Sequence, residues 1–201
     1  FTSSSSFSAD ENQTAIGTVT VSDAESDDIT FSISGSDITI NASSGVIAFA
    51  SAPDYETTSS YAATVTATDG VNSVTQDITV SVNNLNDNAP TFTSSATFSV
   101  EEGTTAIGTA TASDADGNDL TFSISGSDIS INSSTGAMVF NSAPDYEKQT
   151  SYSATITVTD GNTSVQQGIT VSIINVVEGP APTNLEVPPY AFLSDEVIKI
   201  G

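Results

Sequence analysis

Apolar and polar residues alternate through short runs of the chain, a period of two that is typical of β-strands with one buried face. Ile29, Phe31 and Ile33 alternate with threonine and serine, and the run 61–67 repeats the pattern. Each run ends in residues that favour turns, such as the Asp69–Gly70 pair. No window shows helical periodicity, so the sequence predicts an all-β protein.

The chain also repeats itself. Phe1–Ser4 returns as Phe92–Ser95, an offset of 92 − 1 = 91 residues, and Thr30–Ile38 returns unchanged as Thr121–Ile129. Repeats of this kind indicate one structural unit used more than once. The sequence therefore predicts two repeats and a remnant, with boundaries at 1–91, 92–182 and 183–201. The remnant is expected to be the first strand of a truncated third repeat.

About seven short strands in each repeat favour two tandem seven-stranded Greek-key β-sandwiches of the immunoglobulin-like kind. Each sandwich should have a core of large apolar side chains at matching positions. These are Phe31, Phe49 and Tyr61 in the first repeat and Phe122, Phe140 and Tyr152 in the second.

The amino-acid composition excludes several kinds of catalytic and metal site. The chain has neither His nor Cys, which excludes imidazole bases, thiolate nucleophiles, disulfides and zinc sites built from those residues. Its net charge of -23 repels nucleic acid and anionic membranes and attracts cations. No apolar run is long enough for membrane insertion. We therefore expect a protein that is not an enzyme and whose natural counter-charge is a hard metal ion.

The acidic residues lie at corresponding turns of the two repeats. In the first repeat Glu11 follows the first strand, Asp-x-Glu occurs at 54–56, and Asp69 ends a strand. In the second repeat Asp-x-Asp occurs at 114–116, and the segment 84–90 between the repeats reads Asn-Leu-Asn-Asp-Asn-Ala-Pro. Five such motifs resemble the cadherin repeat, in which the order along the chain is Glu, Asp-x-Asp, Asp-x-Glu, Asp and the linker, and the resemblance covers residues 1–182. The Thr-, Ser- and Asp-rich texture resembles bacterial or archaeal surface proteins that contain such repeats.

The resemblance implies that a calcium-binding linker joins the two repeats and that their junction holds about three Ca²⁺ ions. The implied ligands are the side chains of Glu11, Asp54, Glu56, Asn86, Asp87, Asp114, Asp116 and Asp160, and the carbonyls of Leu85, Asn88 and Asn118. Ca²⁺ takes six to eight oxygen ligands of these types. A weaker second junction, for one or two ions, is implied at Glu102, Asp145, Glu147 and Glu178.

The sequence departs from the family pattern in several places, including both linkers. Asn84 stands at a linker position where the pattern has Asp, which removes one charge. At the end of the second repeat Val177 stands where the first has Asn86, so the second junction has lost an amide ligand.

We therefore expect a calcium-dependent rigid spacer or adhesion module of a long extracellular or cell-surface protein, whose partners are neighbouring repeats of the same chain. One alternative is a subunit of an extracellular filament, assembled by strand pairing of 183–201 with like subunits. Another is a carbohydrate-binding β-sandwich that binds surface glycans. An acid hydrolase using two carboxylates ranks below both. The acidity could also serve solubility alone.

Four segments match the N-glycosylation sequon Asn-x-Ser/Thr, at Asn12, Asn41, Asn132 and Asn162. In a chain so rich in serine and threonine, most such matches are expected to occur by chance.

Overall fold

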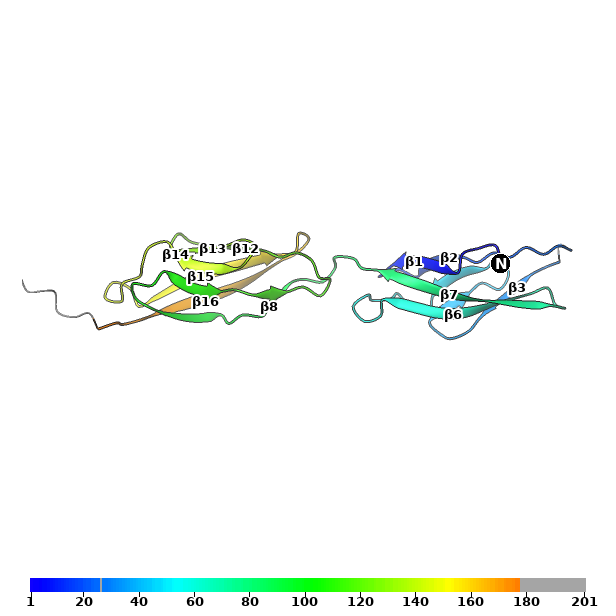
Figure 1. Ribbon diagram of the computed structural model, residues 1–201, viewed down its shortest axis with the longest axis horizontal. Coiled ribbons are helices and arrows are strands. Elements are labelled where there is room, and N and C mark those ends of the chain that lie inside the picture. Colours follow the sequence, from blue (N-terminus) through cyan, green and yellow to red (C-terminus); the bar gives the residue numbers. More distant parts are fainter. Residues whose placement is uncertain (26, 178–201) are drawn as a thin grey trace, which may run out of the picture.

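The computed structural model describes residues 1–25 and 27–177. Figure 1 shows two elongated lobes placed end to end, with a narrow connection between them. The N-terminal lobe holds β1–β7 and the C-terminal lobe β8–β16, and no helix occurs among the described residues. The all-β prediction is confirmed. The expected strand within 183–201 lies outside the described residues, as does Glu178.

In the N-terminal lobe a four-stranded sheet, in the order β1-β7-β6-β3, faces a three-stranded sheet in the order β2-β5-β4. Its strands are β1 (Ser6–Asp10), β2 (Ala15–Thr18), β3 (Thr30–Ile33), β4 (Ile38–Ile40), β5 (Val46–Phe49), β6 (Ser60–Thr68) and β7 (Ser73–Asn83).

The C-terminal lobe repeats this plan with sheets β12-β15-β16-β9 and β10-β14-β13, and adds the short pair β11-β8. Its strands are β8 (Thr91–Phe92), β9 (Thr97–Glu101), β10 (Ala106–Thr109), β11 (Ala112–Ser113), β12 (Thr121–Ile124), β13 (Ile129–Ile131), β14 (Ala137–Phe140), β15 (Ser151–Thr159) and β16 (Ser164–Ile174).

The first long strand of each lobe lies parallel to the last one. β1 pairs with β7 and β9 pairs with β16, in equivalent registers. The described strands number seven in the first lobe and nine in the second, because the two-residue β8 and β11 pair only in the second. The backbone path is nevertheless shared, since Thr2 N–H donates to Thr20 O at 2.9 Å and Thr93 N–H donates to Thr111 O at 2.8 Å.

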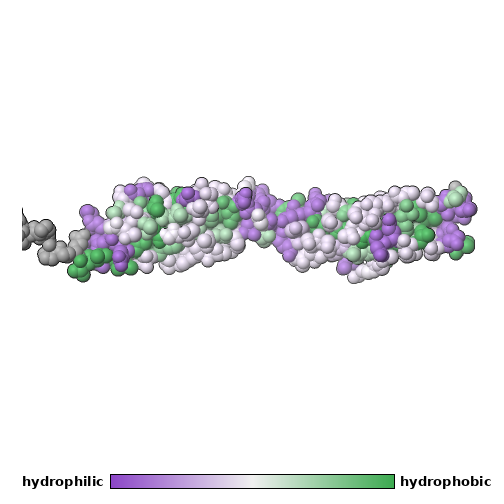
Figure 2. Space-filling view, viewed as in Figure 1, coloured by the Kyte–Doolittle hydropathy of each residue, from purple (hydrophilic) through white to green (hydrophobic). Residues whose placement is uncertain are grey.

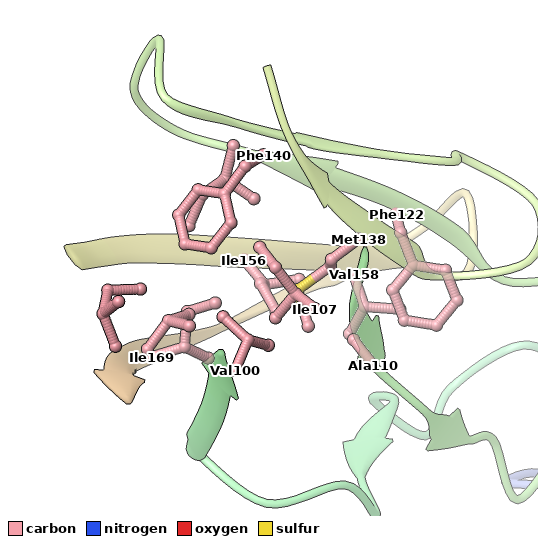
Figure 3. Close-up of a cluster of buried hydrophobic side chains, with 12 residues drawn as sticks. Val100, Ile107, Ala110, Phe122, Met138, Phe140, Ile156, Val158 and Ile169 are labelled. Carbon is pink, nitrogen blue, oxygen red and sulfur yellow. The ribbon is translucent and has the colours of Figure 1, made fainter. Parts of the chain in front are cut away.

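Each lobe has its own hydrophobic core between its two sheets. Figure 3 shows the core of the C-terminal lobe, where Phe122, Met138 and Ile156 lie among the clustered side chains. The large aromatic residues predicted for the cores are there, with Phe140 buried and Tyr152 against it edge to face at 4.8 Å. Such pairs stabilise a core beyond the area that they bury.

A tight turn connects β4 to β5, and its glycine is required by the close approach of the backbone that follows β2. Gly45 has a φ of 69°, and a Cβ at this position would lie 2.2 Å from the carbonyl oxygen of Val19. Gly136 repeats the arrangement in the second lobe, at 2.1 Å from Ala110 O. Only glycine fits such a position without displacing the neighbouring backbone.

Residues 84–90 form the connection between β7 and β8. Figure 2 shows that hydrophilic residues gather around this waist of the molecule. The ends of β1 and β7, the loop before β6, and the turns that follow β11 and β15 all reach it, as the hydrogen bonds below establish.

Candidate metal centre

Glu11 lies at the centre of the N-terminal side of the waist. It follows β1 directly, and only 2% of its surface is exposed. Leu85 N–H donates to its Oε1 and Tyr55 N–H donates to its Oε2, both at 2.7 Å. One buried carboxylate therefore joins the end of β1, the loop before β6 and the linker.

The loop at 53–58 presents two further carboxylates. Asp54 Oδ1 accepts hydrogen bonds from Glu56 N–H at 3.1 Å and Thr57 N–H at 3.3 Å, and its Oδ2 accepts one from the Thr57 hydroxyl at 2.9 Å. The bonds from Thr57 hold the pKa of Asp54 below its usual value. One oxygen from each of Glu11, Asp54 and Glu56 lies within 4.8 Å of the other two.

Glu56 also belongs to a second group that crosses the waist. One oxygen from each of Glu56, Asp87 and Asp116 lies within 4.8 Å of the others, which brings together the first lobe, the linker and the second lobe. Asp116 Oδ2 accepts from Asp87 N–H at 3.0 Å and Asn88 N–H at 2.9 Å. The Asn88 amide donates to Asp116 Oδ1 at 2.9 Å, to Asp87 Oδ1 at 2.9 Å and to Glu56 Oε2 at 3.3 Å.

The pKa values of Glu56 and Asp116 are shifted in opposite directions. Burial raises the pKa of Glu56, and the neighbouring carboxylates of Asp116 and Glu11 raise it further. Burial acts the same way on Asp116, but the hydrogen bonds from Asn88 and Asp87 outweigh it and leave the pKa of Asp116 lowered. Asp116 therefore ionises more readily than Glu56 in this group.

A third set of ligating atoms comes mainly from the second lobe. Six buried side-chain oxygens of the described residues accept no hydrogen bond, and three of them lie here, namely Asn86 Oδ1, Asp114 Oδ2 and Asn118 Oδ1. A buried acceptor without a donor costs about 1–3 kcal/mol, and such groups call for a water or an ion. Amide and carboxylate oxygens are ligands that Ca²⁺ prefers.

Asp160 completes this set from the turn that follows β15, where it is 7% exposed. Asn86 donates from Nδ2 to the Asp160 carbonyl at 3.2 Å, so linker and turn are in contact. Burial raises the pKa of the Asp160 carboxyl, but hydrogen bonds from Thr163 and Asn162 outweigh burial and lower it. These hydrogen bonds therefore favour the ionised form of the Asp160 carboxylate.

The structure also places residues at the waist that the sequence did not assign to the site. The Asn84 amide donates to the Asp116 carbonyl at 2.9 Å, and the Asn162 amide donates to the Asn86 carbonyl at 2.9 Å. The Asn12 amide donates to Oδ2 of Asp87. These contacts depend on how the two lobes and the linker meet, so no local sequence pattern could have predicted them. Of the three predicted carbonyl ligands, that of Leu85 accepts from Asp87 N–H at 3.1 Å.

The predicted second junction has a cluster of three carboxylates at positions equivalent to those of Glu11, Asp54 and Glu56. Glu102 Oε1 accepts from Val176 N–H at 2.7 Å and its Oε2 accepts from Tyr146 N–H at 3.0 Å, which repeats the bonds of Glu11. One oxygen from each of Glu102, Asp145 and Glu147 lies within 4.8 Å of the others.

A lysine distinguishes this cluster from the first. Nζ of Lys148 lies 2.6 Å from Oδ2 of Asp145, at the position that the Thr57 hydroxyl occupies in the first lobe. Lys148 lowers the pKa of Asp145, and Asp145 in turn raises the pKa of Lys148. A cation of the chain itself therefore neutralises part of the second cluster.

Several known proteins share this architecture. The solved structure of human protocadherin-24 EC1-2 has a TM-score of 0.71 at 21% identity, and the match covers 86% of this chain and 94% of that one. Chicken VE-cadherin EC1-2 has a TM-score of 0.65 at 21% identity over 86% of this chain and 98% of that one. Human protocadherin-23 is 33% identical over 174 residues, which is 81% of this chain. The described part of the chain therefore has the fold of cadherin repeats.

The chain spans 5% of the length of protocadherin-23. Residues 86–173 also match a family model described as a bacterial Ig domain, which is a second β-sandwich family. Within residues 1–25 and 27–177 no helix is long and apolar enough to cross a membrane.

Proposed function

We propose that this chain is a calcium-rigidified spacer or adhesion module of a larger extracellular protein. Its repeats are 1–91 and 92–182, and Ca²⁺ binds between them. One observation carries the proposal: carboxylates from both lobes and the linker converge at the waist, near three buried oxygens that accept no hydrogen bond.

The proposed ligands divide into sets that share members. Glu11, Asp54 and Glu56 supply one set, and Glu56 with Asp87 and Asp116 supplies the next. The third set combines the side chains of Asn86, Asp114, Asn118 and Asp160. Sharing of Glu56 between two sets favours closely spaced ions, about three in all, as in a chain of bridged cations.

Charge supports a metal as the missing partner. Seven ligand carboxylates carry a charge of −7 and three divalent ions carry +6, so the net charge of the filled site is 6 − 7 = −1, which is close to neutral. Lys148 is the one lysine or arginine among residues 1–25 and 27–177, and it pairs with Asp145 at the other end of the second lobe. Like charges repel at these separations, so without metal the two lobes should separate at the waist.

The mechanical consequence follows from where the ligands lie. A cation bound by both lobes and by the linker opposes bending at residues 84–90, because bending would separate its ligands. The similar solved structures are of cadherin ectodomain repeats, which supports an extracellular location for this chain as well.

Isothermal titration calorimetry of the whole chain with CaCl₂, after removal of bound metal with a chelator, tests the proposal. We expect saturable binding that Asp116→Asn weakens at least tenfold at one or more sites. Asp37→Asn is the matched control, because Asp37 is exposed and its carboxylate belongs to none of the clusters. Equal loss in both variants, or no saturable heat in the wild type, would show that the acidic residues serve solubility only.

A further inference from the structure

The structure separates the four glycosylation sequons into two pairs. Asn12 and Asn162 use their side-chain amides at the waist, where they donate to Asp87 Oδ2 and to the Asn86 carbonyl. Asn41 and Asn132 lie away from these contacts, and 132 − 41 = 91 residues separate them, which is the repeat offset. They occupy the same turn, between the equivalent strand pairs β4–β5 and β13–β14.

In both turns the asparagine side chain is fixed by its oxygen. Asn41 Oδ1 accepts from Ser43 N–H at 3.1 Å, Ser44 N–H at 3.0 Å and the Ser43 hydroxyl at 3.0 Å. Asn132 Oδ1 accepts from Ser134 N–H at 3.1 Å, Thr135 N–H at 2.9 Å and the Ser134 hydroxyl at 3.0 Å. The serine hydroxyl that defines each sequon therefore holds the amide from the oxygen side.

The nitrogen of each amide is left accessible. Both asparagines are exposed, and neither Nδ2 donates a hydrogen bond to any residue within 1–25 and 27–177. The backbone beneath is held firmly, since Asn41 N–H donates to Val46 O at 2.8 Å and Asn132 N–H donates to Ala137 O at 2.8 Å. A rigid turn thus presents a free carboxamide nitrogen to solvent.

A hollow adjoins each turn at the same place in its lobe. The first has a volume of about 760 Å³ and is lined by residues that include Asp28, Thr30, Phe31, Asn41 and Ser43. The second, of about 550 Å³, is lined by residues that include Asp119, Thr121, Phe122, Ser133 and Ser134. Walls that combine an apolar ring with hydroxyl and carboxylate groups offer a sugar both contact surface and hydrogen-bond partners.

We propose that Asn41 and Asn132 are the N-glycosylation acceptors of this chain, and that Asn12 and Asn162 are not. The inference rests on the extracellular location in the proposed function, because the reaction belongs to secreted chains. The required donor is an oligosaccharide linked to a polyprenyl diphosphate. The amide nitrogen forms a bond to the anomeric carbon, the bond from that carbon to the diphosphate oxygen breaks, the diphosphate leaves with the electron pair, and the nitrogen gives up one proton.

The choice between the pairs has a structural reason. A sugar on Asn41 or Asn132 extends from an exposed turn and leaves the hydrogen bonds of the waist as they are. A sugar on Asn12 or Asn162 would stand where these amides contact Asp87 and the Asn86 carbonyl, between parts that the proposed metal holds together.

The test is secretion of the whole chain from a eukaryotic host that N-glycosylates its exports. Peptide mass spectrometry after enzymatic deglycosylation in ¹⁸O-water marks every occupied asparagine. We expect marks at Asn41 and Asn132 only, and the loss of one glycan mass in each of Asn41→Gln, Ser43→Ala, Asn132→Gln and Ser134→Ala. Unmarked Asn41 and Asn132 in the secreted protein, or marks at Asn12 or Asn162 of comparable occupancy, would overturn the proposal.

The Asn41→Gln/Asn132→Gln double variant separates this inference from the metal proposal. We expect it to bind Ca²⁺ with the affinity of the wild type, because neither residue lies in the metal clusters. In the wild-type chain, missing glycans with normal Ca²⁺ binding would contradict the glycosylation inference alone. Normal glycans with no Ca²⁺ binding in the wild-type chain would contradict the metal proposal alone.

Discussion

At the scale of single residues, the waist depends on Glu11 because its two oxygens each hold a different segment. Leu85 N–H and Tyr55 N–H both point at this carboxylate, which is 2% exposed. Glu102 makes the equivalent bonds to Val176 and Tyr146 while remaining partly exposed. We therefore expect the same pair of hydrogen bonds to contribute more to stability in the first lobe than in the second.

Glu11→Gln should destabilise the protein even in chelator. A glutamine offers one oxygen and one NH₂ group to two N–H donors, so one buried donor loses its acceptor. We expect the free energy of unfolding in urea to fall by about 1–3 kcal/mol. Glu102→Gln should cost less because its site is more exposed, and Asp37→Asn should cost nothing. A Glu11→Gln variant as stable as the wild type would disprove this role.

Glu56 should make the metal-free protein more stable as the pH falls from neutral toward about 4.5, the usual glutamate value. Its pKa is raised in the folded state, so folding favours its protonated form, and stability is gained as pH drops through that raised pKa. Asp54, Asp116 and Asp160 have lowered pKa values, so they stabilise above the usual aspartate range and lose that effect in stronger acid.

Melting curves in chelator across this pH range check the sign. Glu56→Gln should abolish the gain in melting temperature on mild acidification while keeping the loss in stronger acid. The same variant should weaken Ca²⁺ binding, because it removes a ligand shared by two clusters. An unchanged acid-induced gain in the variant would show that another group is responsible.

At the scale of strands and loops, the alternating pattern was enough to predict β6 and β7, whose inward faces carry Val65 and Val80. It could not predict that β1 pairs with β7 in parallel, because alternation fixes a strand's buried face and not its neighbour. The two-residue strands β8 and β11 are too short to show any period.

Sequence patterns likewise pointed to some residues of the candidate site and not to others. The acidic motifs led to Glu11, Asp87 and Asp116, because such motifs mark ligands by residue type and spacing alone. The bridging amides of Asn84 and Asn162 depend on how the two lobes meet, which no local pattern records. Likewise the sequence suggested the carbonyl of Asn118, whereas the structure shows its side-chain oxygen buried without a donor.

The loop before β6 and its equivalent before β15 differ at one informative position, Thr57 against Lys148. Thr57→Lys should place an ammonium beside Asp54, as Lys148 lies beside Asp145, and compete with Ca²⁺ at the first cluster. An exposed pair of this kind is weak, so we expect calorimetry to show about a two- to fivefold loss of affinity. Lys148→Thr is the reciprocal variant and should strengthen binding at the second cluster. Affinities unchanged in both variants would exclude the competition.

At the scale of the whole molecule, two small cores are joined end to end through seven linker residues, 84–90. Ca²⁺ bound by the native state alone should raise its stability by mass action, by about 2.7 kcal/mol at a hundredfold excess over the dissociation constant. We expect a higher melting temperature in millimolar Ca²⁺ than in EGTA. Mg²⁺ at the same concentration is the control, because it favours a smaller octahedral site that keeps its waters.

The central claim is that metal, rather than the protein alone, makes this chain rigid at the waist. Small-angle X-ray scattering of the wild-type chain in EGTA and in millimolar Ca²⁺ measures this directly. The account predicts a broad distribution of interatomic distances in EGTA and, in Ca²⁺, a narrower one with the larger maximum dimension of two lobes end to end. Identical distributions in the two buffers would contradict it.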